Sequence, residues 1–220
     1  SSAIVGGYRG VASGGYSAII GGKINSATGS YGTVIGGQYN YALSGDSMSI
    51  IGGNSNQVTG SYSVIVGGYT NSISDRKSSV VGGDDNNISS SHSSIVGGYR
   101  NSISGEYSSL VGGYSNTITS KYSSIVGGKD NRVTGNNSVV IGGSGITGTT
   151  TNSVYVPGLV VSGPIVNPLT NVSGTYSVTS TDYLIVKNGS GAVTVNLPAA
   201  SSQTAGRVLI IKDGYGNAGS

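Results

Sequence analysis

Two adjacent apolar residues return at a fixed interval along the first two thirds of the chain, directly before a Gly-Gly pair. Eight of the nine intervals between these pairs are 15 residues, and the other is 16. The first glycines of the pairs are Gly6, Gly21, Gly36, Gly52, Gly67, Gly82, Gly97, Gly112, Gly127 and Gly142. Fifteen residues suffice for two short strands and two tight turns, whereas a repeat of two helices needs about 30 or more. The pattern predicts an all-β fold, a parallel β-solenoid of small coils.

The apolar pair predicts a strand that is buried on both sides, because successive strand residues point to opposite faces. A third apolar position, six residues after the first Gly, can meet one of these faces across the coil interior. The two rows of the pair are represented by Ile65, Ile95 and Ile125 and by Val66, Val81, Val96, Val111 and Val126. We expect one row to line the coil and the other to be covered by another copy of the chain. The pattern leaves open which row does which.

The row without a partner inside the coil is the argument for self-association. Covering it would contribute about 1.5–3 kcal/mol for each Val or Ile that is buried. Three copies around an axis are the simplest closed packing for a narrow roll with one apolar side, although symmetry alone also allows two or four. The sequence therefore predicts a homotrimer, with the chain itself as its main partner.

The polar positions of the repeat predict its corners. An Asn stands four residues after the first Gly in coil after coil. Asn tolerates the left-handed backbone conformation and can hydrogen-bond its own turn. Stacked Asn side chains also bond one another along a repeat. The predicted turn ladder is Asn71, Asn86, Asn101, Asn116 and Asn131.

Tyrosines two residues after the first Gly predict an aromatic strip along another corner. Its members are Tyr69, Tyr99 and Tyr114, with Tyr8 at the same position of an earlier coil. An exposed strip of this kind could stack on sugar rings. The alternative interpretation, which we favour at this stage, is that the rings shield the backbone of the corner and pack on one another.

The 15-residue period is lost from Leu159 onwards, and the sequence there shows ordinary strand and turn patterns. We predict a solenoid over residues 1–156, a connector over 157–173 and a small antiparallel β domain over 174–220. One strand is expected in the connector, at Leu159–Val161. The strands expected in the small domain are Thr175–Val178, Tyr183–Lys187, Ala192–Leu197 and Arg207–Lys212, with a hairpin turn at Asn188–Gly191. The sequence stops directly after a predicted strand, so we expect this domain to be truncated at its C-terminus.

The repeats resemble a known family. The run Asn101-Ser-Ile-Ser-Gly-Glu-Tyr-Ser-Ser-Leu-Val-Gly-Gly113 and its copies resemble the head repeats of YadA-like trimeric autotransporter adhesins, and similar repeats occur in bacteriophage tail fibres. The resemblance covers about residues 1–156, although the second Gly of each pair is not part of the family's pattern. It implies a left-handed β-roll in a tight trimer. The segments that begin at Thr181, Gly191 and Ala205 resemble a small β domain of phage tail fibres.

Composition and charge exclude several classes of function. Charged residues make up 9% of the chain, the formal charge of +3 is not clustered, and there is no Cys. Nucleic-acid binding needs clustered basic side chains, so we expect none. No apolar run is long enough to insert into a membrane.

The residues offer little for catalysis. The one histidine, His92, stands where other coils have Tyr, and we interpret it as a surface substitution. Asp84 and Asp85 are adjacent carboxylates at turn positions, where solvation is the simpler interpretation than a metal site. We predict no enzyme activity, no catalytic residue, no cofactor and no metal.

The resulting hypothesis is a structural or adhesive fibre segment, from a phage tail fibre or a phage-derived fibre. It would lie outside the cell, on a virion or a bacterial surface. It would project a tip, outside this sequence, toward a glycan or protein receptor. The alternative is the head of a bacterial trimeric autotransporter adhesin. A remote alternative is a monomeric ice-binding solenoid, for which one position holds Thr28, Thr59, Thr119 and Thr134 but is interrupted by Ser44, Ser74, Ser89 and Ser104.

Overall fold

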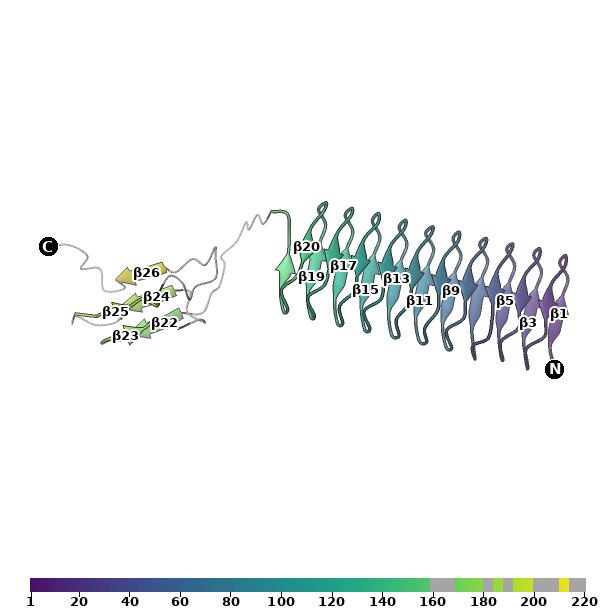
Figure 1. Ribbon diagram of the computed structural model, residues 1–220, viewed down its shortest axis with the longest axis horizontal. Coiled ribbons are helices and arrows are strands. Elements are labelled where there is room, and N and C mark those ends of the chain that lie inside the picture. The colour runs from purple at the N-terminus through teal and green to yellow at the C-terminus, as the bar shows by residue number, and fades with distance from the viewer. Residues whose placement is uncertain (159–168, 180–183, 188–191, 200–209, 214–220) are drawn as a thin grey trace. The chain divides into compact units, whose positions relative to one another are not determined.

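The computed structural model describes residues 1–158, 169–179, 184–187, 192–199 and 210–213. The chain divides into two compact units, Ser1–Leu159 and Val160–Ser220. The first unit is a parallel β-solenoid of about eleven coils (Figure 1), and none of the residues just given is helical. The predicted all-β solenoid is confirmed, whereas its left hand stays a prediction.

Each coil contributes one strand to each of two parallel sheets. The eleven-stranded sheet consists of β1 (Ala3–Val5), β3 (Ala18–Ile20), β5 (Thr33–Ile35), β7 (Ser49–Ile51), β9 (Val64–Val66), β11 (Ser79–Val81), β13 (Ser94–Val96), β15 (Ser109–Val111), β17 (Ser124–Val126), β19 (Val139–Ile141) and β21 (Val154–Tyr155). The ten-stranded sheet consists of β2 (Val11–Ala12), β4 (Ser26–Ala27), β6 (Tyr41–Ala42), β8 (Gln57–Val58), β10 (Ser72–Ile73), β12 (Asn87–Ile88), β14 (Ser102–Ile103), β16 (Thr117–Ile118), β18 (Arg132–Val133) and β20 (Thr147–Gly148).

The core of the solenoid is a narrow column between the two sheets. Each coil gives it the middle residue of the three-residue strand and the second residue of the two-residue strand. In one coil these are Ile95 of β13 and Ile103 of β14, and both are fully buried. Val96 follows Ile95 and points outward, because adjacent strand residues alternate between faces. In the single chain the three-residue strand is therefore buried on one side only, not on both as the pattern predicts.

A buried column of Asn side chains supports one corner of eight successive coils. The backbone N–H of Asn101 donates to Oδ1 of Asn86 at 3.0 Å, and Nδ2 of Asn101 donates to the carbonyl of Gly113 at 3.2 Å. The same bonds link coil to coil from Asn25 to Asn131. The column thus satisfies backbone groups that the tight corner would otherwise bury without a partner.

Removal of one Asn from this column is expected to destabilise the solenoid. Asn101→Ala leaves the N–H of Asn116 and the carbonyl of Gly113 without these partners, at a cost of about 2–3 kcal/mol in free energy of unfolding. Asn87→Ala is the matched control, because Asn87 is exposed on β12. Chemical denaturation of both variants checks this. Equal stability of the two would contradict a structural role of the column.

A second column, of Ser side chains, supports the opposite corner. From Ser63 to Ser138, each Ser hydroxyl accepts the backbone N–H of the Ser one coil on and donates to carbonyl oxygens of neighbouring turns. Ser108, for example, accepts from Ser123 N–H at 3.2 Å and donates to Ser120 O at 3.0 Å. The sequence pattern shows this Ser position, but only the structure shows that it points inward.

The one 16-residue coil absorbs its extra residue at a corner. Ser44 has a φ of 56°, and the N–H of Gly45 donates to the carbonyl of Leu43 at 2.6 Å. Both sheets keep their register across this coil, since Ala42 still pairs with Val58 and Ile35 with Ile51. Leu43, and not Ser44, therefore stands in the row of Thr28 and Thr59.

The second unit contains short strands in two parallel sheets. One has the order β22 (Leu169–Val172), β24 (Leu184–Lys187), β26 (Ile210–Asp213), and the other pairs β23 (Tyr176–Ser177) with β25 (Val195–Asn196). The predicted antiparallel domain is wrong for these strands. Successive strands from β22 to β26 alternate between the two sheets, and the strands paired within each sheet are parallel. The expected strand Leu159–Val161 and the hairpin at Asn188–Gly191 lie outside the described residues.

Candidate functional site

The outer face of the eleven-stranded sheet carries two straight rows of side chains, which we call the Ser/Val face. The first row holds the first residue of each strand, Ala3, Ala18, Thr33, Ser49, Val64, Ser79, Ser94, Ser109, Ser124, Val139 and Val154. The second row holds the third residue, Val5, Ile20, Ile35, Ile51, Val66, Val81, Val96, Val111, Val126 and Ile141. Both rows lie on one face because residues two apart in a strand point the same way.

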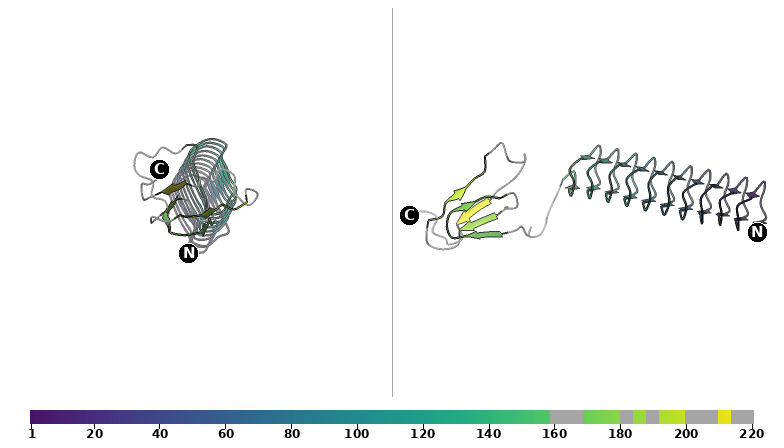
Figure 2. Two further views of the ribbon diagram at one scale, coloured as in Figure 1. Left: turned by 90° about the vertical axis from the view of Figure 1, so that its left-hand side faces the viewer. Right: turned by 60° about the horizontal axis from the view of Figure 1, so that its bottom comes forward.

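The backbone arranges the Ser/Val face as a regular grid. Ser94 pairs with Ser79 and Ser109, and the Val residues beside them pair in the same register. Neighbouring strands lie ~4.8 Å apart, and the two rows lie ~6.6 Å apart. The left-hand view in Figure 2 looks along the solenoid and shows the outlines of successive coils running nearly parallel. The sheet thus presents its side chains with little change of direction from coil to coil.

The two rows offer different chemical groups. From Ile20 to Ile141 the β-branched side chains of the second row are 39–48% exposed. In the first row, the hydroxyls of Ser49, Ser79, Ser94, Ser109 and Ser124 have no hydrogen-bond partner within the part of the chain that the structure describes. Neither row contains a charged residue. The face therefore combines exposed methyl groups with hydroxyls that can bond to an external surface.

The outer face of the ten-stranded sheet is less regular. Its threonines were the reason to consider ice binding from sequence, but several of their hydroxyls are engaged with the backbone. Thr119 Oγ1 donates to Val133 O at 3.3 Å, and Thr134 Oγ1 donates to Gly148 O at 3.4 Å. Leu43 and Arg132 also interrupt its two outward rows. This face is the weaker candidate for an ordered contact.

One comparison with known proteins bears on this solenoid. Residues 12–112 match the grass antifreeze beta roll family. The matched segment runs from the end of β2 to the residue after β15. No curated protein matches the chain.

This match corrects the functional hypothesis drawn from the sequence. The hypothesis of a phage tail fibre or bacterial adhesin segment is not supported, because the family that matches residues 12–112 is an antifreeze roll. The finding agrees better with the remote alternative of an ice-binding solenoid. The repeats predict the roll but not its function, because one fold can carry unrelated functions. The resemblance to YadA-like heads and the extracellular location stay predictions.

The structure separates the residues that the sequence grouped as core or seam. Ile65, Ile95 and Ile125 are completely buried inside the coils, whereas Val66, Val81, Val96, Val111 and Val126 belong to the Ser/Val face. The Asn ladder from Asn71 to Asn131 lies inside its corner. Sequence reasoning missed the free Ser hydroxyls beside the Val row. The signal that was present is the absence of charge at both outward positions in ten successive strands, β1 to β19.

The aromatic strip lies at the corner that leads into the ten-stranded sheet. Tyr69 is 54% exposed and Tyr114 is 41% exposed, whereas Tyr99 is half-buried. The ring centroids of Tyr99 and Tyr114 lie 5.4 Å apart, and the guanidinium of Arg100 lies 4.9 Å from the Tyr99 centroid. A hydrogen bond to Asp85 raises the pKa of Arg100 further above its usual value.

The structure adds no catalytic or metal centre within the described residues. His92 stacks on Tyr107 with centroids 4.6 Å apart, in a column of rings that continues to Tyr122. No group of three or more potential metal ligands occurs among the residues that could be searched. In that same part of the chain, no helix has the length and apolar character needed to cross a membrane. The absence of enzyme activity stays a prediction.

Proposed function

We propose that the solenoid binds ice through the Ser/Val face. The observation that carries the proposal is the uncharged grid of unpartnered Ser hydroxyls and exposed β-branched side chains. The match of residues 12–112 to the grass antifreeze beta roll family supports it.

The physical argument rests on spacing and chemistry together. The strand separation of ~4.8 Å is close to the repeat of oxygen atoms along one axis of ordinary ice. Water beside the methyl groups cannot bond to them and stays bonded to other water, while each Ser hydroxyl can fix one water by a hydrogen bond. A charged side chain would instead hold its own hydration shell. Ordered water on this face can therefore join an ice surface.

Rigidity and length complete the argument. Every strand of the face between β1 and β21 is bonded to both neighbours. Buried side chains fix the corners, with Asn from Asn25 to Asn131 and Ser from Ser63 to Ser138. The rows are therefore organised before binding, which reduces the entropy lost on contact. Many weak contacts along the face then add up on one crystal surface.

The test compares two bulky substitutions on opposite faces of neighbouring coils. Val96→Tyr places a ring on the Ser/Val face, and Ser104→Tyr places the same ring on the ten-stranded sheet. We expect Val96→Tyr to reduce inhibition of ice recrystallisation by about fivefold or more, because a raised ring prevents simultaneous contact along the rows. Ser104→Tyr should keep the activity. Thermal melting by circular dichroism should show both variants folded.

Other outcomes contradict the proposal in distinct ways. An unmodified chain without effect on ice recrystallisation or on the freezing point overturns ice binding. Loss of activity in Ser104→Tyr alone moves the contact to the ten-stranded sheet and overturns the assignment to the Ser/Val face.

The predicted homotrimer competes with this proposal for the same surface. A seam along Val66, Val81 and Val96 would cover the second row and remove it from ice. We therefore expect light scattering after size exclusion to give the mass of one chain, 21.8 kDa. A mass three times larger would instead support the seam and leave ice no access to the second row.

A further inference from the structure

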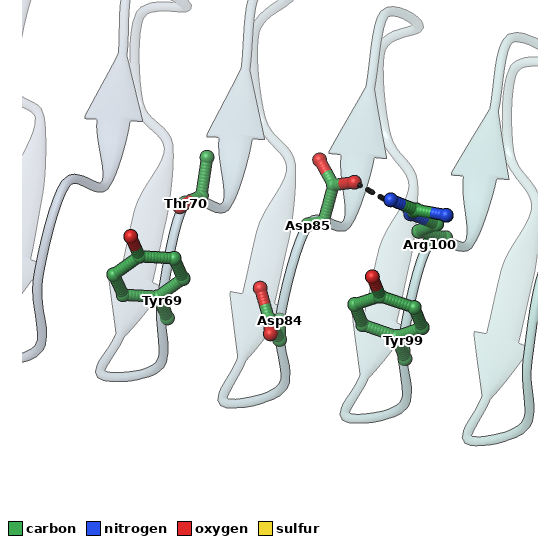
Figure 3. A pocket seen from close by; sticks show the side chains of 6 residues that line it. All are labelled: Tyr69, Thr70, Asp84, Asp85, Tyr99 and Arg100. Carbon is green, nitrogen blue, oxygen red and sulfur yellow. Dashed lines mark hydrogen bonds and ion pairs between the residues drawn. The ribbon is translucent and has the colours of Figure 1, made fainter.

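A notch interrupts the aromatic strip at the corner between the Ser/Val face and the ten-stranded sheet. Tyr69, Asp84 and Tyr99 occupy the same position in three successive coils and are joined by parallel β-bridges. Asp84 thus stands where the neighbouring coils have a ring. The resulting hollow has a volume of about 260 Å³ and is lined by Tyr69, Thr70, Asp84, Asp85, Tyr99 and Arg100 (Figure 3).

The two rings form unequal walls of this notch. They are two coils apart, which corresponds to ~9.6 Å along the solenoid. Figure 3 shows Tyr69 and Tyr99 on either side of Asp84. Tyr69 is 54% exposed, whereas Tyr99 is held by Arg100 and Tyr114. Tyr69 therefore offers a free aromatic surface, and Tyr99 is a fixed wall.

The polar groups of the notch have bonding capacity left. The carboxylate of Asp84 has no hydrogen bond or ion pair within the described part of the chain. Beside it, Arg100 Nε donates to Asp85 Oδ2 at 3.2 Å, which leaves the other guanidinium N–H groups free to donate. The notch thus presents acceptors at Asp84 and donors at Arg100 to one bound molecule.

We propose that this notch binds one neutral hexose unit of a glycan. Its volume lies below the range of pockets for drug-sized ligands and suits a single sugar ring. The C–H face of a pyranose matches the exposed ring of Tyr69. Neighbouring hydroxyls can donate to the Asp84 carboxylate in charge-assisted hydrogen bonds and accept from Arg100.

Charge limits the class of sugar. Two carboxylates against one guanidinium give the notch a net negative charge, so a uronic acid would be repelled. A strip that only shields backbone would account for the contact between Tyr99 and Tyr114. It would not account for an unpaired carboxylate between two rings.

The experiment measures binding of soluble oligosaccharides to the full chain by isothermal titration calorimetry. The probes are cellohexaose, maltohexaose and mannohexaose, with hexagalacturonate as the anionic counterpart. We expect saturable binding of at least one neutral probe with a Kd in the range of about 0.1–10 mM, which corresponds to a few weak contacts. Hexagalacturonate should bind more weakly than that probe.

Three variants tie the binding to the notch. Tyr69→Ala is expected to weaken it about tenfold or more, because the stacking surface is lost. Asp84→Tyr is expected to abolish the binding, because the added ring fills the notch. The fold should tolerate this ring, since Tyr99 and Tyr114 hold rings at the same position of the next two coils. Tyr122→Ala, which removes an exposed ring from the other corner, should leave the affinity unchanged.

The proposal is overturned if none of the neutral probes binds the unmodified chain. It is also overturned if Asp84→Tyr binds as well as the unmodified chain, or if hexagalacturonate binds more tightly than every neutral probe. Melting curves of the variants exclude unfolding as the cause of a loss. The proposal does not depend on ice binding, so Val96→Tyr should keep its affinity for the sugar.

Discussion

Replacing Ile95 by Asp is expected to unfold the solenoid around its coil, whereas the same change at the next residue should be tolerated. Ile95 is completely buried in the column between the sheets, and no cation faces it there. The change removes a large apolar side chain and buries a charge without a partner, at a cost of about 5 kcal/mol or more in free energy of unfolding. Val96→Asp is the matched control, because Val96 points outward and is 47% exposed. Its cost should stay below about 1 kcal/mol.

Circular dichroism melting and limited proteolysis distinguish the two variants. A coil contacts only its neighbours, so local unfolding at Ile95 should expose cleavage sites in the coil formed by β13 and β14. Equal destabilisation by both substitutions would contradict the inward and outward assignment of the two rows. A Val96→Asp variant that stays folded and changes mass from trimer to monomer would support the seam predicted from sequence.

The second large effect is expected at the Gly-Gly pair, where two adjacent glycines should respond differently to the same substitution. A Cβ at Gly98 would meet Nδ2 of Asn101 and lie 2.6 Å from the carbonyl oxygen of Gly113, and its φ is 87°. Neither the Asn column nor the backbone of the next coil can move without breaking bonds. Gly98→Ala should therefore cost about 3–5 kcal/mol in free energy of unfolding.

Gly97→Ala provides the control on the same corner. Gly97 has a φ of 68°, but a Cβ there finds nothing closer than the carbonyl oxygen of Val81 at 4.0 Å. Only the backbone strain remains, which amounts to about 1–2 kcal/mol. Urea denaturation of the two variants measures the difference. Equal effects would mean that positive φ alone, and not close approach of neighbouring coils, explains why both positions hold Gly.

The period and the interior of the solenoid could be predicted because they follow from local rules. A spacing of 15 residues fixes the architecture, and strand alternation places Ile95 and Val96 on opposite faces. Which face was inward could not be decided, since both rows are β-branched and apolar. The direction depends on the turns, where the Asn and Ser columns point inward together with the Ile row.

Other features lay beyond the sequence for different reasons. The sequence does not show which turn absorbs the extra residue of the 16-residue coil. Counting from the preceding Gly placed Ser44 in the row of Thr28 and Thr59, whereas the structure places Leu43 there. In the second unit the repeat signal is gone, and Asn188–Gly191 favoured a hairpin over parallel pairing. For the candidate site, the hydroxyl row was visible as Ser residues, but hydrogen-bond satisfaction is a property of the folded chain.

The 16-residue coil also bears on how such a molecule can change. Since Ser44 adds a residue at a corner without moving either sheet, that corner can accept a longer graft while both faces keep their spacing. Since each coil is held by its two neighbours, deletion or duplication of a 45-nucleotide unit of the gene would shorten or lengthen the grid by one step. Unequal recombination within the gene would then tune the length of the Ser/Val face without a new fold.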